Sequence, residues 1–570
     1  MAGIASEKRG AKKGNAMRCL LLGTALLVAC SDAAVPDRFD TDLPVTGRYA
    51  VDDSGVTMGW PGSGLAFTLP EGGDAVVTLT DSGDGYMDLD VEGHTRTIDL
   101  EPGMESYTLV EDAAPGTEVR LTRRTEHYDT GLFTINDLDA QGAVPTRFDG
   151  NILFLGDSIT AGFGVAGDTR DCPNTPVMHS PTESYAMLAA DRLNADAHLI
   201  AVSGRGVVHN WDYNPEPVMP AQIDLALPDR PEGPEWDHAL FPADVVVVTL
   251  GTNDWSAIDP GRDLFRQGYR DMLTDLRERH PEAHIVSVRG PLLTGEQGAA
   301  IRDGSDWAMA QLGDPEISAL DVALSDDGLA YSCNYHPGRE SMRDMAEQLA
   351  AHIAARTDLR DRPASERILP PDWMVADGKA HFAKRVDEID AEPLRAGGVL
   401  LLGDSITEAW KWQPQQVADV VHNHGVGWDV VDGLRARWPQ YASLSPEQVL
   451  VKIGTNDLSN DIAVEDIASD VRALVRDLKA EFPDARITLQ SVLPREVAMR
   501  DRVDGLNARY AAVAEELNVE WLDLTEAFSA EDGSLRAELT NDGLHLLPSG
   551  YALWRQELLD HNARMDGSGG

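Results

Sequence analysis

A pattern that occurs twice is the strongest constraint on how this 570-residue chain folds. In each copy an apolar stretch runs into Gly-Asp-Ser-Ile-Thr, within residues 153–160 and 400–407. A second apolar stretch in each copy then runs into Gly-Thr-Asn-Asp, within residues 250–254 and 453–457. Two copies are too few for a solenoid, whose repeats must stack to bury a core. The repeat therefore predicts two separate domains with the same fold.

Both copies alternate short apolar runs with amphipathic stretches, which predicts parallel strands connected by helices. We therefore expect two flavodoxin-like α/β domains, each a parallel sheet flanked by helices. The expected strands include 152–155 and 245–250 in the first copy and 399–402, 449–453 and 487–493 in the second, with helices at 185–193 and 268–280.

The residues before the first copy have a different sequence pattern. Short alternating stretches such as 75–80 and 118–122 are separated by Gly, Asp and Pro, which is typical of an all-β sandwich. A segment rich in Pro and charge at 360–372 indicates a boundary between the two copies. The predicted organisation is a signal peptide at 1–29, a linker at 30–46, a β-sandwich (jelly-roll) domain at 47–145, an α/β domain at 146–358, a linker at 359–394, a second α/β domain at 395–562 and a flexible tail at 563–570.

Residues 17–30 combine a basic residue, an apolar run too short to span a bilayer and a final Leu-Val-Ala-Cys. This pattern resembles the bacterial lipobox and predicts acylation of Cys30, with Ser31 favouring the outer membrane. The protein would then be anchored to the cell envelope by lipid. The alternatives are an ordinary signal peptide, which gives a secreted protein, or a short buried helix, and translation could start at Met1 or Met17.

Lys and Arg number 48 against 95 Asp and Glu, so the net charge is −47. Such a charge repels phosphate backbones and anionic lipid, which excludes nucleic acid as a partner and leaves the lipid anchor as the only expected membrane contact. No metal-ligand cluster, phosphate loop or dinucleotide fingerprint occurs in the sequence, so we expect no metal and no cofactor. No pattern indicates an oligomeric state.

A serine directly after a buried strand lies at the carboxyl edge of a parallel sheet, where α/β proteins bind ligands. Ser158 and Ser405 have this position and are the candidate nucleophiles. A serine needs a base to take its proton and donors to stabilise the oxyanion that forms. Asn253 and Asn456, at the end of the second strand of each copy, are candidate oxyanion donors.

Each copy ends with a histidine that is a candidate base. In the second copy Asp542 precedes His545 by three residues and can orient its imidazole, which predicts a Ser–His–Asp triad. In the first copy the residue three before His336 is Cys333, so we expect a Ser–His dyad, whose imidazole a backbone carbonyl could orient. Cys172 and Cys333 are predicted to form a disulfide, because the loops that carry them must converge if Ser158 and His336 do.

These blocks resemble the SGNH, or GDSL, hydrolase superfamily over residues 150–350 and 395–558. The resemblance implies a serine ester hydrolase. Residues 47–354 further resemble carbohydrate esterase family 2, in the stretches 60–63, 123–126, 203–206 and 333–337. That resemblance assigns the oxyanion hole to the Gly204 N–H with Asn253, and sugar packing to Tyr335.

Residues 375–560 resemble the platelet-activating-factor acetylhydrolase branch, which assigns the second oxyanion hole to Gly427 with Asn456. Here Trp428 stands where this branch usually has glycine. Its backbone N–H could still serve as the oxyanion donor, while its indole could crowd the site or form a sugar-binding wall. Trp255 is a third candidate aromatic for substrate binding.

We expect an acetylxylan esterase-like enzyme that removes O-acetyl groups from a polysaccharide through acyl-enzyme chemistry at two sites. The alternatives are a lipid esterase or thioesterase, since fold does not fix substrate, and a carbohydrate-binding surface protein with one inactive copy.

Overall fold

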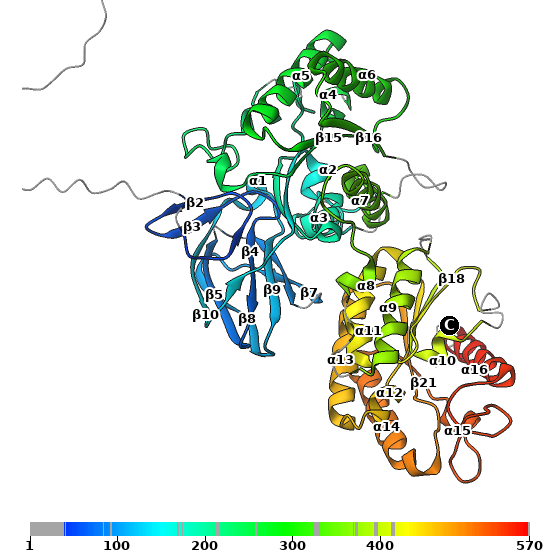
Figure 1. Ribbon diagram of the computed structural model, residues 1–570. Helices are drawn as coiled ribbons and strands as arrows, with labels where there is room; N and C mark the ends of the chain where they lie inside the picture. The colour runs from blue at the N-terminus through cyan, green and yellow to red at the C-terminus, as the bar shows by residue number, and fades with distance from the viewer. Residues whose placement is uncertain are drawn as a thin grey trace, which may run out of the picture. The chain divides into compact units, whose positions relative to one another are not determined.

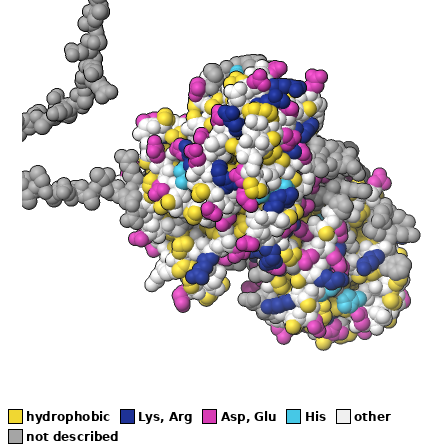
Figure 2. Space-filling view, turned by 45° about the horizontal axis from the view of Figure 1, so that its top comes forward, with side chains coloured by type: hydrophobic (Ala, Val, Ile, Leu, Met, Phe, Trp, Pro, Cys, Tyr) yellow, Lys and Arg dark blue, Asp and Glu magenta, His cyan; other side chains and the backbone are white. Residues whose placement is uncertain are grey.

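The computed structural model describes residue 39 and residues 41–567, apart from 82, 84, 92–93, 168–169, 174, 213, 215, 257–258, 323–330, 369, 371–373, 393–396 and 412–416. The predicted signal peptide and Cys30 lie outside the described residues. None of the described helices is long and apolar enough to cross a membrane. Asp and Glu side chains are scattered over the face seen in Figure 2, as the net charge of −47 leads one to expect.

The N-terminal part is a sandwich of two antiparallel sheets. Along β5 the side chains of Ala75, Val77 and Leu79 are buried in its core while their neighbours are more exposed, as expected of a strand with one face on the core. One sheet contains β1 (Val45–Thr46), β4 (Gly64–Leu69), β9 (Thr117–Arg123), β6 (Tyr86–Val91) and β7 (His94–Asp99), with β11 (Val144–Pro145) beside β4; the other contains β2 (Tyr49–Asp52), β3 (Gly55–Met58), β10 (Phe133–Ala140), β5 (Gly73–Asp81) and β8 (Gly103–Ala113).

The first α/β domain contains a five-stranded parallel sheet in the order β13-β12-β14-β15-β16. This is the doubly wound order in which the first strand lies beside the second and third, so its carboxyl end faces a crevice. The strands are β12 (Gly150–Gly156), β13 (Ala195–Ala201), β14 (Val245–Thr249), β15 (His284–Arg289) and β16 (Ile317–Asp321).

Successive side chains of β12 enter two different cores, because the sheet is covered on both faces. Leu153 and Leu155 pack with the cluster that includes Phe265 of α5, whereas Ile152 and Phe154 pack with Tyr185 of α3. α1 (His127–Thr130) lies between β9 and β10 of the sandwich. The helices of this domain are α2 (Ser158–Ala161), α3 (Tyr185–Leu193), α4 (Thr252–Ser256), α5 (Arg262–Arg279), α6 (Gly295–Leu312) and α7 (Arg339–Ala354), with 3-10 turns at Pro176–Met178, Pro181–Glu183, Met219–Gln222, His238–Leu240 and Cys333–Tyr335.

The second α/β domain repeats this sheet order as β18-β17-β19-β20-β21, again parallel. Figure 1 shows α9, α11 and α13 on one side of the sheet and α16 on the other. The strands are β17 (Val399–Gly403), β18 (Val421–Gly425), β19 (Gln448–Lys452), β20 (Arg486–Gln490) and β21 (Glu520–Leu522); the helices are α8 (Ala364–Arg367), α9 (Ala376–Asp390), α10 (Ser405–Glu408), α11 (Val431–Arg437), α12 (Thr455–Ser459), α13 (Val464–Glu481), α14 (Arg500–Leu517), α15 (Thr525–Phe528) and α16 (Pro548–Gly567), with 3-10 turns at Trp438–Leu444 and Val497–Met499.

Two predicted boundaries differ from the structure. The stretch 359–394, predicted as a linker, contains α8 and α9, and Phe382, Val386 and Ile389 of α9 are buried in the second core. Their spacing of four and three residues is that of a core-facing helix, which the nearby Pro-rich segment obscured. The predicted tail at 563–570 begins inside α16, which extends to Gly567.

Candidate active sites

Both candidate serines begin a helix at the carboxyl end of the first strand of their sheet. Ser158 follows β12 and Ser405 follows β17. The preceding aspartate caps each helix: Asp157 accepts a hydrogen bond from the Ile159 N–H at 3.0 Å, and Asp404 accepts one from the Ile406 N–H at 3.0 Å. The Asp of each Gly-Asp-Ser motif therefore fixes the turn that presents the serine.

In the first site the Nε2 atom of His336 lies 2.7 Å from the Ser158 Oγ atom. The Nδ1 atom of His336 lies 3.2 Å from the backbone carbonyl oxygen of Asn334. A carbonyl only accepts hydrogen bonds, so Nδ1 carries the proton and Nε2 is free to accept the proton of the serine. Burial lowers the pKa of His336, which keeps the imidazole neutral and available as a base. The geometry is that of the dyad predicted from the sequence.

In the second site the Nε2 atom of His545 lies 3.0 Å from the Ser405 Oγ atom, and its Nδ1 atom lies 2.7 Å from Asp542 Oδ2. Asp542 Oδ1 also accepts hydrogen bonds from the N–H groups of Leu544 and His545, at 2.9 and 2.8 Å. Burial raises the pKa of Asp542, but these hydrogen bonds together hold it below its ordinary value. The carboxylate is therefore charged, and it orients the imidazole as a triad requires.

The structure places the two cysteines of the first domain together. Cys172 and Cys333 form a disulfide with a Cα–Cα distance of 5.0 Å. Cys333 precedes His336 by three residues, so the bond ties the histidine loop to a loop 161 residues away in sequence.

The loops that follow the second strand in chain order, 202–205 and 426–429, are equivalent; we call them the oxyanion loops. The N–H of Val202 donates to the Gly156 carbonyl at 3.4 Å, and that of Val426 donates to the Gly403 carbonyl at 2.9 Å. Gly204 and Trp428 occupy the same step of the loop, both with positive φ, 79° and 70°. A left-handed backbone strains a bulky residue but suits glycine, so Gly204 adopts this conformation more easily than Trp428 does.

This equivalence corrects one predicted residue. Gly427 was expected to supply the second oxyanion N–H, but its N–H donates to Glu408 Oε2 at 2.6 Å. The residue that matches Gly204 is Trp428, and a tryptophan retains the backbone N–H that the role requires. The sequence analysis left the Trp428 N–H open as a donor, and the backbone conformation of the loop favours it over Gly427.

The two candidate asparagines occupy matching positions beside these loops. Asn253 Nδ2 donates to the Arg205 carbonyl at 2.9 Å and to Asp157 Oδ2 at 3.1 Å. Asn456 Nδ2 donates to the Asp429 carbonyl at 2.8 Å. Each amide is therefore oriented by the oxyanion loop.

The candidate aromatic residues separate into two groups. Tyr335 and Trp428 are 56% and 52% exposed, and the Arg170 guanidinium lies over the Tyr335 ring, 5.5 Å from its centroid. Trp255 is 6% exposed and packs edge-on against Phe265, so it belongs to the core and offers no face to a sugar, contrary to the expectation. Trp211, which the sequence analysis missed, is 60% exposed, and its indole lies against the Cα atom of Gly204. Only the folded loop brings these two residues together.

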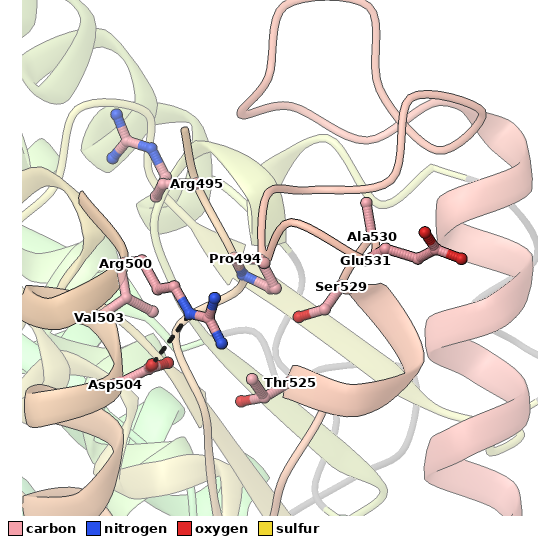
Figure 3. Close-up of a pocket in the computed structure, with 10 residues that line it drawn as sticks. Pro494, Arg495, Arg500, Val503, Asp504, Thr525, Ser529, Ala530 and Glu531 are labelled. Carbon is pink, nitrogen blue, oxygen red and sulfur yellow. Dashed lines mark ion pairs between the residues drawn. The ribbon is translucent and has the colours of Figure 1, made fainter. Parts of the chain in front are cut away.

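Figure 3 shows a pocket in the second domain whose lining includes Pro494, Arg495 and Arg500. Arg500 pairs with Asp504 at 3.6 Å. Neither Ser405 nor His545 is among the described residues that line it, so the pocket is separate from the triad.

Comparisons with known proteins agree with this geometry. Residues 154–384 and 401–553 match the GDSL-like Lipase/Acylhydrolase family, and residues 45–145 match the domain described as Carbohydrate esterase 2 N-terminal. These matches confirm the predicted resemblance and the predicted fold class.

Several characterised proteins are similar to this chain. An acetylxylan esterase / glucomannan deacetylase of Cellvibrio japonicus is 27% identical over 59% of this chain and 96% of its own length. Cellulase/esterase CelE of Acetivibrio thermocellus is 28% identical over 56% of this chain, and the match spans only 40% of CelE. Platelet-activating factor acetylhydrolase IB subunit alpha2 of Rattus norvegicus is 28% identical over 33% of this chain and 83% of its own length.

A solved structure is similar as well. It is a family two carbohydrate esterase from Clostridium thermocellum in complex with cellohexaose, 28% identical, with a TM-score of 0.51 over 55% of this chain and 98% of that chain.

Proposed function

Since this chain belongs to the GDSL-like lipase/acylhydrolase family and is an ester hydrolase, we propose that it removes O-acetyl groups from a plant-type polysaccharide such as acetylated xylan or glucomannan. One observation carries the choice of substrate: the sandwich that matches the carbohydrate esterase 2 N-terminal domain is followed directly by a hydrolase domain with a Ser–His pair at 2.7 Å. The relative named for xylan and glucomannan deacetylation aligns over nearly its full length.

The proposed reaction at the first site uses Ser158 as nucleophile and His336 as general base. The serine oxygen attacks the acetyl carbonyl while its proton moves to Nε2 of His336. The resulting oxyanion is bound by the N–H of Gly204 and by the Asn253 amide, which releases its hydrogen bond to Asp157 to donate to the oxyanion. The bond from the acetyl carbon to the sugar oxygen then breaks, protonated His336 gives its proton to that oxygen, and the sugar leaves with a free hydroxyl while the acetyl group stays on Ser158. Water repeats the sequence on the acetyl-enzyme and releases acetate. Exposed Tyr335 and Trp211 offer aromatic faces on which a sugar ring can pack.

We also propose that the second site is an independent esterase, with Ser405, His545 and Asp542 as its triad and Trp428 and Asn456 as its oxyanion donors. The distances of 3.0 and 2.7 Å along the triad support this role. The exposed Trp428 indole would form one wall of its substrate site.

Acetate release tests the proposed substrate. We expect the full chain to release acetate from acetylated xylan and glucomannan, and to hydrolyse 4-nitrophenyl acetate much faster than the butyrate or octanoate. Faster turnover of the longer acyl chains would indicate a lipid esterase or thioesterase. Retention on the polysaccharide without release of acetate would indicate a binding protein.

For location we propose that the protein is exported and anchored by lipid on Cys30. Covalent lipid with two or more acyl chains holds a protein stably on a membrane. Cys30→Ser is therefore expected to shift the protein from the membrane fraction to the soluble exported fraction, as measured by fractionation and immunoblotting. If Cys30→Ser still fractionates with membranes, the anchor is not at this cysteine.

A further inference from the structure

Each oxyanion loop has a carboxylate bonded to the backbone N–H just before its proposed oxyanion donor. In the first site the N–H of Ser203 donates to Glu126 Oε2 at 2.8 Å. In the second site the N–H of Gly427 donates to Glu408 Oε2 at 2.6 Å. Because Gly204 and Trp428 are equivalent, Ser203 and Gly427 are equivalent too.

The two carboxylates come from different parts of the fold. Glu126 lies between β9 of the sandwich and α1, whereas Glu408 is the last residue of α10, three residues after Ser405. The residue three after Ser158 is Ala161, the last residue of α2, which has no carboxylate to offer. The carboxylate that bonds the oxyanion loop therefore comes from the sandwich in the first domain and from the domain's own helix α10 in the second.

The surroundings of Glu126 suit a rigid support. Its side chain is 1% exposed, and it also accepts hydrogen bonds from the Ser203 hydroxyl and, at 3.1 Å, from the Tyr128 hydroxyl. Burial raises the pKa of Glu126 to about 7, against the lowering effect of the hydrogen bonds from Ser203. A carboxyl group accepts hydrogen bonds whether or not it is charged, so the contact with the loop does not depend on ionisation.

We propose that Glu126 and Glu408 are positioning residues that hold the oxyanion loops in their active conformation, and that the sandwich thereby completes the first catalytic site in addition to any role in binding sugar. Neither carboxylate touches the reacting atoms. Each fixes the peptide unit that precedes the donor N–H, and a displacement of about 1 Å in such a group costs roughly 10²-fold in rate. This inference rests on the proposed esterase activity.

The test uses the full chain with Ser405→Ala, so that only the first site reports, and 4-nitrophenyl acetate as substrate. Glu126→Ala is expected to lower kcat about 10- to 100-fold with KM little changed, because the loop loses its support while the substrate surface remains. Glu126→Gln keeps an acceptor oxygen and is expected to restore most of kcat.

Asp88→Asn is the matched control. Asp88 is another buried sandwich carboxylate that contacts the first hydrolase domain, through Thr182 Oγ1 at 2.8 Å, and it pairs with Arg124 at 2.6 Å. Its hydrogen-bond partners in the described structure are Thr97, Arg124 and Thr182, none of which belongs to the oxyanion loop, so its substitution should lower the melting temperature and leave kcat unchanged. The mirror experiment, Glu408→Ala against Glu408→Gln in a Ser158→Ala chain, tests the second site and serves if Glu126→Ala fails to fold.

Unchanged kcat in Glu126→Ala and Glu408→Ala would overturn the inference. So would equal losses of kcat in Glu126→Ala and Asp88→Asn, because Glu126 would then act only through the contact between domains. An activated acetyl ester is the readout, so the result is separate from the choice of polysaccharide: a parent chain active on this ester but not on acetylated xylan refutes the proposed substrate alone.

Discussion

Ser158→Ala and Ser405→Ala are each expected to remove one of two additive esterase activities, and the double variant is expected to lose both. Loss of a catalytic serine lowers kcat at its own site by about 10³-fold or more, because no other group in the site can form the acyl-enzyme. Burst and steady-state kinetics on 4-nitrophenyl acetate, followed by acetate release from acetylated xylan, measure the two contributions. Both serines are small, so neither substitution should disturb the fold.

Ser305→Ala provides the control for this experiment. Ser305 is a buried serine of α6 whose hydroxyl donates to the Arg302 carbonyl at 3.1 Å and accepts from Arg289 at 3.5 Å. Neither partner is a candidate site residue, so its loss should leave both activities intact. If Ser405→Ala lost no activity on any acetylated substrate, the second domain would be a binding module and the tandem-site proposal would fail.

The parts of these sites that sequence could predict are those encoded within one short segment. Ser158 and Ser405 each follow an apolar strand and an aspartate that caps the next turn. One short segment therefore predicts the strand, the turn and the nucleophile. Asp542 and His545 are three residues apart, and the spacing alone predicts their contact. In both cases the chemistry depends on neighbours in sequence.

The parts that sequence could not predict depend on contacts between distant segments. Trp255 is of a residue type that can pack on a sugar, but the helix that carries it turns its indole into the core. Glu126 reaches the first oxyanion loop from 77 residues away in sequence. Trp211 follows the loop closely in sequence but contacts Gly204 only because the chain between them turns back. The choice between Gly427 and Trp428 as donor has the same origin, because it depends on the backbone conformation of the loop, where Trp428 has a positive φ.

Asp542→Asn is expected to lower kcat of the second site at least about 100-fold, approaching 10⁴-fold, while Asn334→Gly in the first site changes kcat little. An amide at 542 can still cap the turn through its oxygen, but its NH₂ group faces Nδ1 of His545 and favours the tautomer with the proton on Nε2. That tautomer cannot accept the proton of Ser405.

In the first site the orienting group is the Asn334 carbonyl, which any residue supplies, and glycine tolerates the φ of 54° at this position. Both variants are measured with 4-nitrophenyl acetate in chains whose other serine is replaced by alanine. The contrast between the two variants is the decisive quantity, since large and equal losses would mean that the Asn334 side chain orients His336, and the first site would then be a triad with an amide in place of the acid.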